Sequence, residues 1–121
     1  MKTNLIVLSL VMPCVDFIYL KLISNYFTIQ VKNVQGSNIK LDYTATIFCY
    51  MFLILGMYYF IIVPNRSVFD AFLLGIIIYG VFETTNKALL KKWKWKTVFI
   101  DTLWGGVLFS ITSYIVKKIK I

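Results

Sequence analysis

The chain contains no histidine among its 121 residues. This absence excludes zinc and haem sites with histidine ligands, hydrolytic triads built on histidine, and a histidine proton switch. Cysteine is scarce as well, because only Cys14 and Cys49 occur, each within an apolar stretch. Such a pair does not make the disulfide framework of a small secreted protein. We expect both cysteines to be small, buried apolar residues.

Acidic residues are also few, since five carboxylates stand against thirteen basic residues and leave a net charge of +8. Eight of the basic residues fall within 87–96 and 117–120, at the ends of apolar segments. A nucleic-acid-binding protein instead needs a basic face on a soluble fold. Lysines that flank apolar segments contact lipid headgroups. We therefore expect the partner to be a bilayer with anionic headgroups, and not a nucleic acid.

Apolar sequence is what the chain has in abundance, because 60% of it is hydrophobic and its mean hydropathy is +0.79. A soluble domain is usually about 45–50% apolar, so too few polar residues remain to cover a water-exposed surface. Four stretches approach the length of about 20 residues that crosses a bilayer as a helix. They lie at about 4–24, 44–63, 68–87 and 98–116, within one membrane domain over 1–121. The sequence predicts an all-α, polytopic membrane protein, a four-transmembrane-helix bundle.

The segments between these stretches indicate how the helices connect. Residues 25–42 form the longest connection and are rich in turn-forming residues, so we expect a polar loop there. Residues 64–67 are a tight turn, which predicts that the second and third helices are antiparallel neighbours. Eight basic residues on the side of the long loops outnumber five on the side of the termini, Lys2 and Lys120 included. The positive-inside rule then favours cytoplasmic long loops, in a bacterial inner, organellar or viral membrane.

Three carboxylates interrupt the apolar stretches: Asp16, Glu83 and Asp101. From a rise of about 1.5 Å per helical residue, all three lie in the membrane half beside the lysines of 87–96. A charge within a span is costly and normally faces the interior of a bundle. Residues one helical turn away from each acid share its face. The predicted intramembrane polar cluster consists of Asp16, Tyr19, Glu83, Thr85, Asn86, Asp101 and Trp104.

Three interpretations of this cluster remain open, and we favour them in the following order. In the first, the acids are protonated or paired with Lys87 or Lys21, and they hold the helices together in a structural or partner-binding protein. In the second, the acids bind a cation or relay protons in a transporter-like protein. An enzyme is third, because acids alone can hold Mg²⁺ but no nucleophile–base pair is evident. The small interior suggests a second copy or another membrane protein as partner, and no cofactor is expected.

Two further sets of residues have roles that follow from their position. Tryptophan and lysine at the edge of a span anchor it in the headgroup layer. The predicted headgroup contacts are Lys91, Lys92, Trp93, Lys94, Trp95 and Lys96. Small residues allow two membrane helices to approach closely, as we expect at Gly75, Gly80, Gly105 and Gly106.

The segments Phe-Glu-Thr-Thr-Asn at 82–86 and Thr-Val-Phe-Ile-Asp-Thr-Leu-Trp-Gly at 97–105 carry a family resemblance. Together with a loop tryptophan, they are similar to the pattern Tyr-Asp-x-Thr-Asn, Trp, Thr-x-x-Asp-x-x-Trp-Gly. Residues 15–20 resemble the same pattern's first-helix segment Leu-Asp-x-x-Trp-Leu. The chain thus resembles a bacterial family of predicted membrane proteins with four spans, catalogued as domain of unknown function 2177.

The resemblance implies a polar core shared by the family, and it implies no activity. Its members here would be Asp16, Glu83, Thr85, Asn86, Asp101, Trp104 and Gly105. Two positions depart from the family pattern, since Glu83 replaces an aspartate and Tyr19 replaces a tryptophan. The longer glutamate moves its carboxylate by about one methylene, which is unfavourable for a tightly fixed metal geometry.

Overall fold

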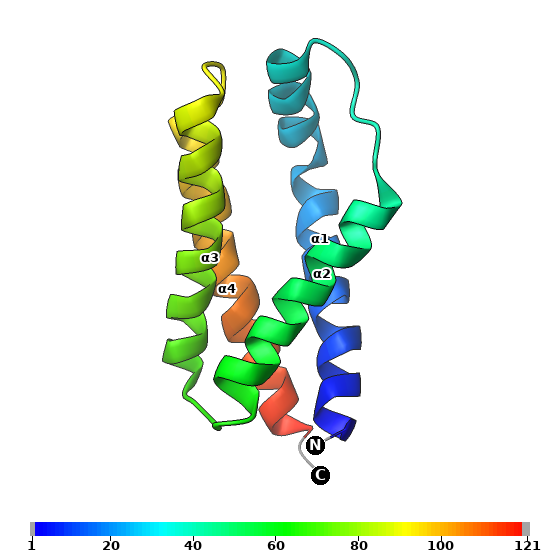
Figure 1. Ribbon diagram of the computed structural model, residues 1–121, viewed down its shortest axis with the longest axis vertical. Coiled ribbons are helices and arrows are strands. Elements are labelled where there is room, and N and C mark those ends of the chain that lie inside the picture. The colour runs from blue at the N-terminus through cyan, green and yellow to red at the C-terminus, as the bar shows by residue number, and fades with distance from the viewer. Residues whose placement is uncertain (1, 120–121) are drawn as a thin grey trace.

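The computed structural model describes residues 2–119, with side chains from Asn4 onward, and consists of four helices (Figure 1). These are α1 (Lys2–Gln35), α2 (Tyr43–Met57), α3 (Val68–Leu89) and α4 (Trp95–Lys118), and a π-helical turn, η1 (Tyr58–Ile62), continues α2. Each of the four is long and apolar enough to cross a membrane. The predicted four-helix fold is confirmed. Of the charges counted above, Lys120 and the side chain of Lys2 lie outside the described part of the chain.

Helix α1 is longer than the sequence predicted, because it continues through residues 25–35, where we expected a loop. It ends at Gly36, which has φ +76° and donates its N–H to the carbonyl of Lys32 at 2.8 Å. This is the left-handed cap that glycine favours at a helix C-terminus. Thirty-four helical residues span about 51 Å, against a hydrocarbon core of about 30 Å. The last turns of α1 therefore stand beyond the hydrocarbon.

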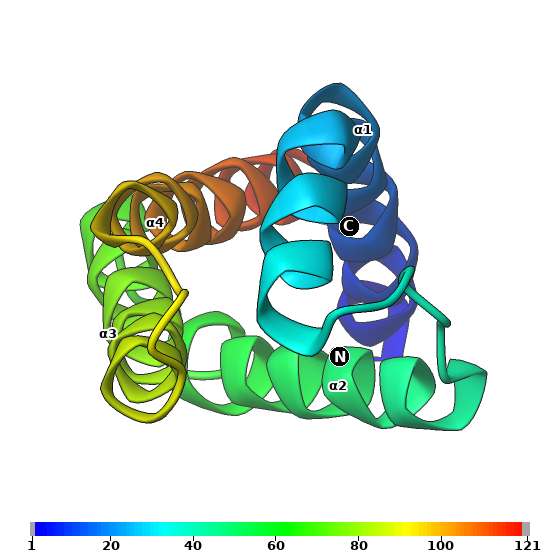
Figure 2. The same cartoon turned by 90° about the horizontal axis from the view of Figure 1, so that it is seen from above.

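Helices α3 and α4 lie side by side along their length, and glycine is what allows it (Figures 1 and 2). A Cβ added at Gly75 would lie 2.1 Å from the carbonyl oxygen of Gly105, and one at Gly106 would lie 2.7 Å from the Phe72 ring. A Cβ on Gly105 would meet the side chain of Tyr79 at 2.3 Å. The expected close approach is confirmed at these three glycines. At Gly80 a Cβ would make an ordinary contact of 3.6 Å with Thr102.

The apolar core lies toward the end of the bundle that holds both termini (Figure 1). Its fully buried members come from four helices: Leu8, Met12, Met57, Ala71, Leu108 and Phe109. The outer surface is apolar as well, since large side chains such as Leu22, Phe52 and Phe99 are exposed on it. That surface faces acyl chains in a membrane.

Two expectations about this region need correction. Cys14 and Cys49 are free thiols, and both are exposed and not buried. Helices α2 and α3 are antiparallel in chain direction and meet at their tight turn, but they spread apart above it (Figure 1). An apolar groove of about 350 Å³ separates them and is lined by Cys49, Phe52, Leu53, Ile78, Tyr79 and Phe82. They are thus neighbours only near the turn.

Candidate functional site

Asp16 connects three helices through its two carboxylate oxygens. It is 7% exposed on α1, and its Oδ1 accepts the indole N–H of Trp104 on α4 at 2.8 Å. Its Oδ2 accepts the hydroxyl of Tyr50 on α2. Hydrogen bonds to an ionised carboxylate are stronger than neutral ones. One carboxylate therefore joins α1 to both α2 and α4.

Asp101 makes a second link between α1 and α4. It is 8% exposed, and its Oδ1 accepts the hydroxyl of Tyr19 at 3.3 Å. The Tyr19 ring stacks on Trp104 with centroids 4.3 Å apart and planes 4° from parallel. Because Trp104 donates to Asp16, the stacked pair lies between the two acids and bonds to each of them.

Glu83 brings α3 into the same arrangement. It is fully buried, and its Oε1 accepts the indole N–H of Trp93 at 2.8 Å. Its other oxygen, Oε2, is buried and makes no hydrogen bond within the part of the chain that the structure describes. Glu83 therefore connects α3 to the loop that joins it to α4.

These links join α1, α2 and α4 in one series, and the bond between Glu83 and Trp93 ties α3 to the neighbouring loop; together we name them the carboxylate network. It consists of Tyr50, Asp16, Trp104, Tyr19, Asp101, Glu83 and Trp93. Every donor to a carboxylate oxygen in it is an aromatic O–H or N–H. Tyrosine and tryptophan suit this role because each presents one polar atom on a large apolar body.

Five of the seven residues in the predicted polar cluster lie in this network, and two do not. Thr85 is exposed, and it lies two residues from Glu83, on a different side of α3. Asn86 is half-buried, and its carbonyl accepts the Leu90 N–H at 2.7 Å. The expected lysine partners are elsewhere, because Lys21 is exposed and Lys87 lies 5.8 Å over the ring of Trp95.

Sequence reasoning missed Tyr50 and gave Trp93 a different place. Tyr50 lies in the uncharged second span. The available signal was that a tyrosine hydroxyl inside a membrane span needs a hydrogen-bond partner on another helix. Trp93 was expected in the headgroup layer, but it is 7% exposed and its N–H is bonded to Glu83. The short α3–α4 loop turns its indole inward, so Trp93 is a network residue.

A second polar arrangement fixes the α3–α4 loop against the end of α1. Gln30 is 2% exposed, and its Nε2 donates to the Lys92 carbonyl at 3.0 Å. Its Oε1 accepts the Lys94 N–H at 3.1 Å and the Thr97 hydroxyl at 2.6 Å. The Tyr26 hydroxyl shares a 2.7 Å hydrogen bond with Thr97. These bonds account for the helical extension of α1, because the extension carries Tyr26 and Gln30 to the loop.

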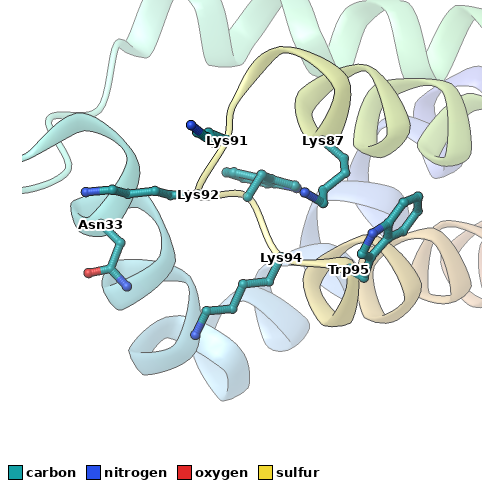
Figure 3. A pocket seen from close by; sticks show the side chains of 7 residues that line it. Asn33, Lys87, Lys91, Lys92, Lys94 and Trp95 are labelled. Atoms are coloured by element: carbon teal, nitrogen blue, oxygen red, sulfur yellow. The ribbon is translucent and has the colours of Figure 1, made fainter.

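Beside this loop lies a cavity of about 490 Å³, which we name the lysine cavity (Figure 3). It is lined by Asn33, Lys87, Lys91, Lys92, Trp93, Lys94 and Trp95. Lys96 does not line it and lies 5.7 Å over the ring of Tyr26. Headgroup contact by these lysines and Trp95 stays a prediction.

Comparison with known proteins gives a family and no closer relative. No curated protein and no solved structure matches the chain significantly. The model of a family described as predicted membrane protein DUF2177 matches residues 2–117, nearly the whole chain. The matched region contains the four helices that can cross a membrane. The chain therefore belongs to the DUF2177 family of predicted membrane proteins, and it is a multi-pass integral membrane protein.

Proposed function

We propose that the protein has a structural or partner-binding role in its membrane, and that the carboxylate network holds its four helices in one fixed arrangement. The observation that carries this proposal is that Asp16, Glu83 and Asp101 each accept a hydrogen bond from an aromatic side chain on another segment. Interhelical hydrogen bonds in membranes contribute about 0.6 kcal/mol on average and up to about 2 kcal/mol. The network would thus supply a few kcal/mol to the bundle.

The same geometry makes a cation site less suitable than a structural role. Both oxygens of Asp16 and one oxygen of Glu83 already accept aromatic donors. Magnesium and calcium need about six or more oxygen ligands. Among the described residues, no three Asp, Glu, Cys or His side chains are grouped closely enough to hold a metal ion.

One observation favours a second candidate function, proton transfer. Glu83 and Asp101 are buried acids and the Tyr19 hydroxyl donates to Asp101, and titratable groups of this kind inside a bundle can relay protons. Fully buried apolar side chains, including Met12 and Phe109, lie between the network and the end that holds the termini. This apolar layer is a barrier to proton transfer across the membrane, so we rank the structural role first.

Asparagine substitutions separate the two functions. We expect Asp16→Asn to lower the free energy of unfolding in detergent by about 1–2 kcal/mol, because its single amide oxygen cannot replace both carboxylate oxygens that accept Trp104 and Tyr50. Asp101→Asn keeps an oxygen for its one donor, Tyr19, and should cost less than about 1 kcal/mol. Asp70→Asn is the matched control, since Asp70 pairs at 3.8 Å with Arg66 outside the network. Its exposed pair should contribute less than about 0.5 kcal/mol.

The same variants are then reconstituted in liposomes for proton and alkali-cation flux measurements. The structural proposal expects no flux from the wild-type protein above that of empty liposomes. Wild-type flux that disappears in a variant of unchanged stability would contradict it and establish the transport function.

A further inference from the structure

We propose that the lysine cavity is a binding site for the headgroup of an anionic phospholipid, with preference for a lipid that carries two phosphates. This proposal rests on the membrane location and on the cavity, and it does not depend on the role of the carboxylate network. The cavity lies at the α3–α4 loop, beside the end of α1 (Figure 3). Basic pockets between helix ends are typical sites for lipids of this kind.

The charge of the cavity is positive and free to meet a ligand. Four lysines line it, and its lining contains no aspartate or glutamate. The nearest acid along α3 is Glu83, which is fully buried and bonded to Trp93. The ion pair found within residues 4–119 is that of Arg66 with Asp70, and it lies near the α2–α3 turn at the opposite end of the bundle from the cavity. Lysine ammonium groups bind phosphate as compact charges with three donors each.

The backbone that carries these lysines is held in place before any ligand arrives. Gln30 binds the carbonyl of Lys92 and the N–H of Lys94, at 3.0 and 3.1 Å. Trp93, between them, is bonded to Glu83 through its side chain and to the Leu90 carbonyl through its N–H at 3.0 Å. A preorganised site loses less conformational entropy on binding than a mobile loop. This distinguishes the cavity from a flexible basic loop.

The directions of the lysines favour a headgroup with separated charges. Figure 3 shows Lys91, Lys92 and Lys94 extending from the loop in different directions around the cavity, with Lys87 reaching in from α3. Charges spread in this way suit two phosphates a few ångströms apart better than one small anion. Trp95 is exposed at the rim, the position of an interfacial anchor.

Native mass spectrometry of the full chain in detergent tests the site, with phosphatidylcholine, phosphatidylglycerol and cardiolipin titrated separately. We expect the wild type to bind cardiolipin, with two phosphates, most tightly. The double variant Lys87→Gln/Lys94→Gln should weaken cardiolipin binding at least tenfold, since it removes two of the four lining lysines. The matched control Lys32→Gln/Lys40→Gln removes the same charge from the last turn of α1 and the loop that follows it, and should change binding less than twofold.

Lys87→Arg/Lys94→Arg keeps the charge and should retain most of the cardiolipin affinity. If the glutamine pair does not fold, Lys91→Gln replaces it, with an expected loss of a few fold. Equal losses of cardiolipin affinity in the cavity variant and the control variant would show that binding depends only on general surface charge, and would contradict a specific site. Equal binding of phosphatidylglycerol and cardiolipin would overturn the preference for two phosphates. Displacement of the lipid by millimolar pyrophosphate would assign the cavity to a soluble phosphate compound instead.

Discussion

Buried carboxylates in this protein accept hydrogen bonds from aromatic side chains, and this pairing has a physical reason. A tyrosine or tryptophan donor brings one polar atom and a large apolar ring, so it bonds to a carboxylate without placing further unpaired groups in the membrane. Tyr19 shows both parts of this, because its hydroxyl donates to Asp101 while its ring stacks on Trp104. Lysine would leave additional donors to be satisfied in the same apolar space.

Glu83 offers a test at this scale. Glutamine at this position keeps an oxygen for the Trp93 N–H, so Glu83→Gln should change the free energy of unfolding by less than about 1 kcal/mol. Glu83→Met has a similar size and leaves the Trp93 N–H unpaired, and it should cost about 1–3 kcal/mol. Unfolding in detergent, followed by circular dichroism, measures both. Equal stability of the two variants would show that Glu83 makes no significant bond.

The acids could be predicted from the sequence because a charge inside an apolar helical stretch is rare and visible. Their partners could not be predicted in the same way. The chain has eight tyrosines and three tryptophans, and helical spacing says nothing about which of them reaches an acid on another helix. Tyr50 meets Asp16 only because α2 crosses α1 at that height (Figure 1). Thr85 was included as a hydrogen-bonding side chain close to Glu83 in the sequence, and its position on α3 turns it away from Glu83.

At the scale of helices, backbone contact between α3 and α4 sets the shape of half the bundle. The hydrophobic effect contributes little to the association of helices in lipid, so close packing at small residues supplies a larger part of the association free energy. Gly75 and Gly105 meet backbone to backbone, and Gly106 receives the side chains of Phe72 and Ile76. This contact places Glu83 and Asp101 opposite each other.

Two alanine substitutions on α3 test this contact, because one position has no room for a Cβ and the other has. Gly75→Ala would put its Cβ 2.1 Å from a carbonyl oxygen, so the helices must separate, and we expect a loss of more than about 2 kcal/mol in the free energy of unfolding. Gly80→Ala has room at 3.6 Å, and alanine favours a helix over glycine by up to about 1 kcal/mol. Gly80→Ala should therefore be neutral or stabilising in the same detergent unfolding assay. A similar loss in both variants would contradict the close α3–α4 contact.

Helix α2 together with η1, helix α3 and helix α4 begin and end within three residues of the spans predicted from hydropathy, whereas α1 does not. Hydropathy locates the apolar part of a helix, and the last eleven residues of α1 are mostly polar or exposed. Their helical state depends on tertiary contacts of Tyr26 and Gln30 with residues that lie more than sixty positions away. Local sequence patterns do not contain that information.

The interior of the bundle is polar toward the α3–α4 loop and apolar toward the opposite end. The lysine cavity and the Gln30 contacts lie at this loop, the carboxylate network follows along the helices, and the apolar core fills the part beyond it. The placement of the long loops in the cytoplasm stays a prediction. This polarity agrees with a bundle that is anchored by headgroups at one surface and held together by the network beneath it.

The central claim is that acids and aromatic donors from separate helices bond to one another inside the bundle. A double-mutant cycle on Asp16→Ala and Tyr50→Phe, measured by unfolding in lipid bicelles, tests it most directly, with exposed Tyr59→Phe in place of Tyr50→Phe as control. The account predicts a coupling energy of about 0.5–2 kcal/mol for Asp16 with Tyr50 and none for Asp16 with Tyr59. Effects of Asp16→Ala and Tyr50→Phe that add to within about 0.3 kcal/mol would contradict it.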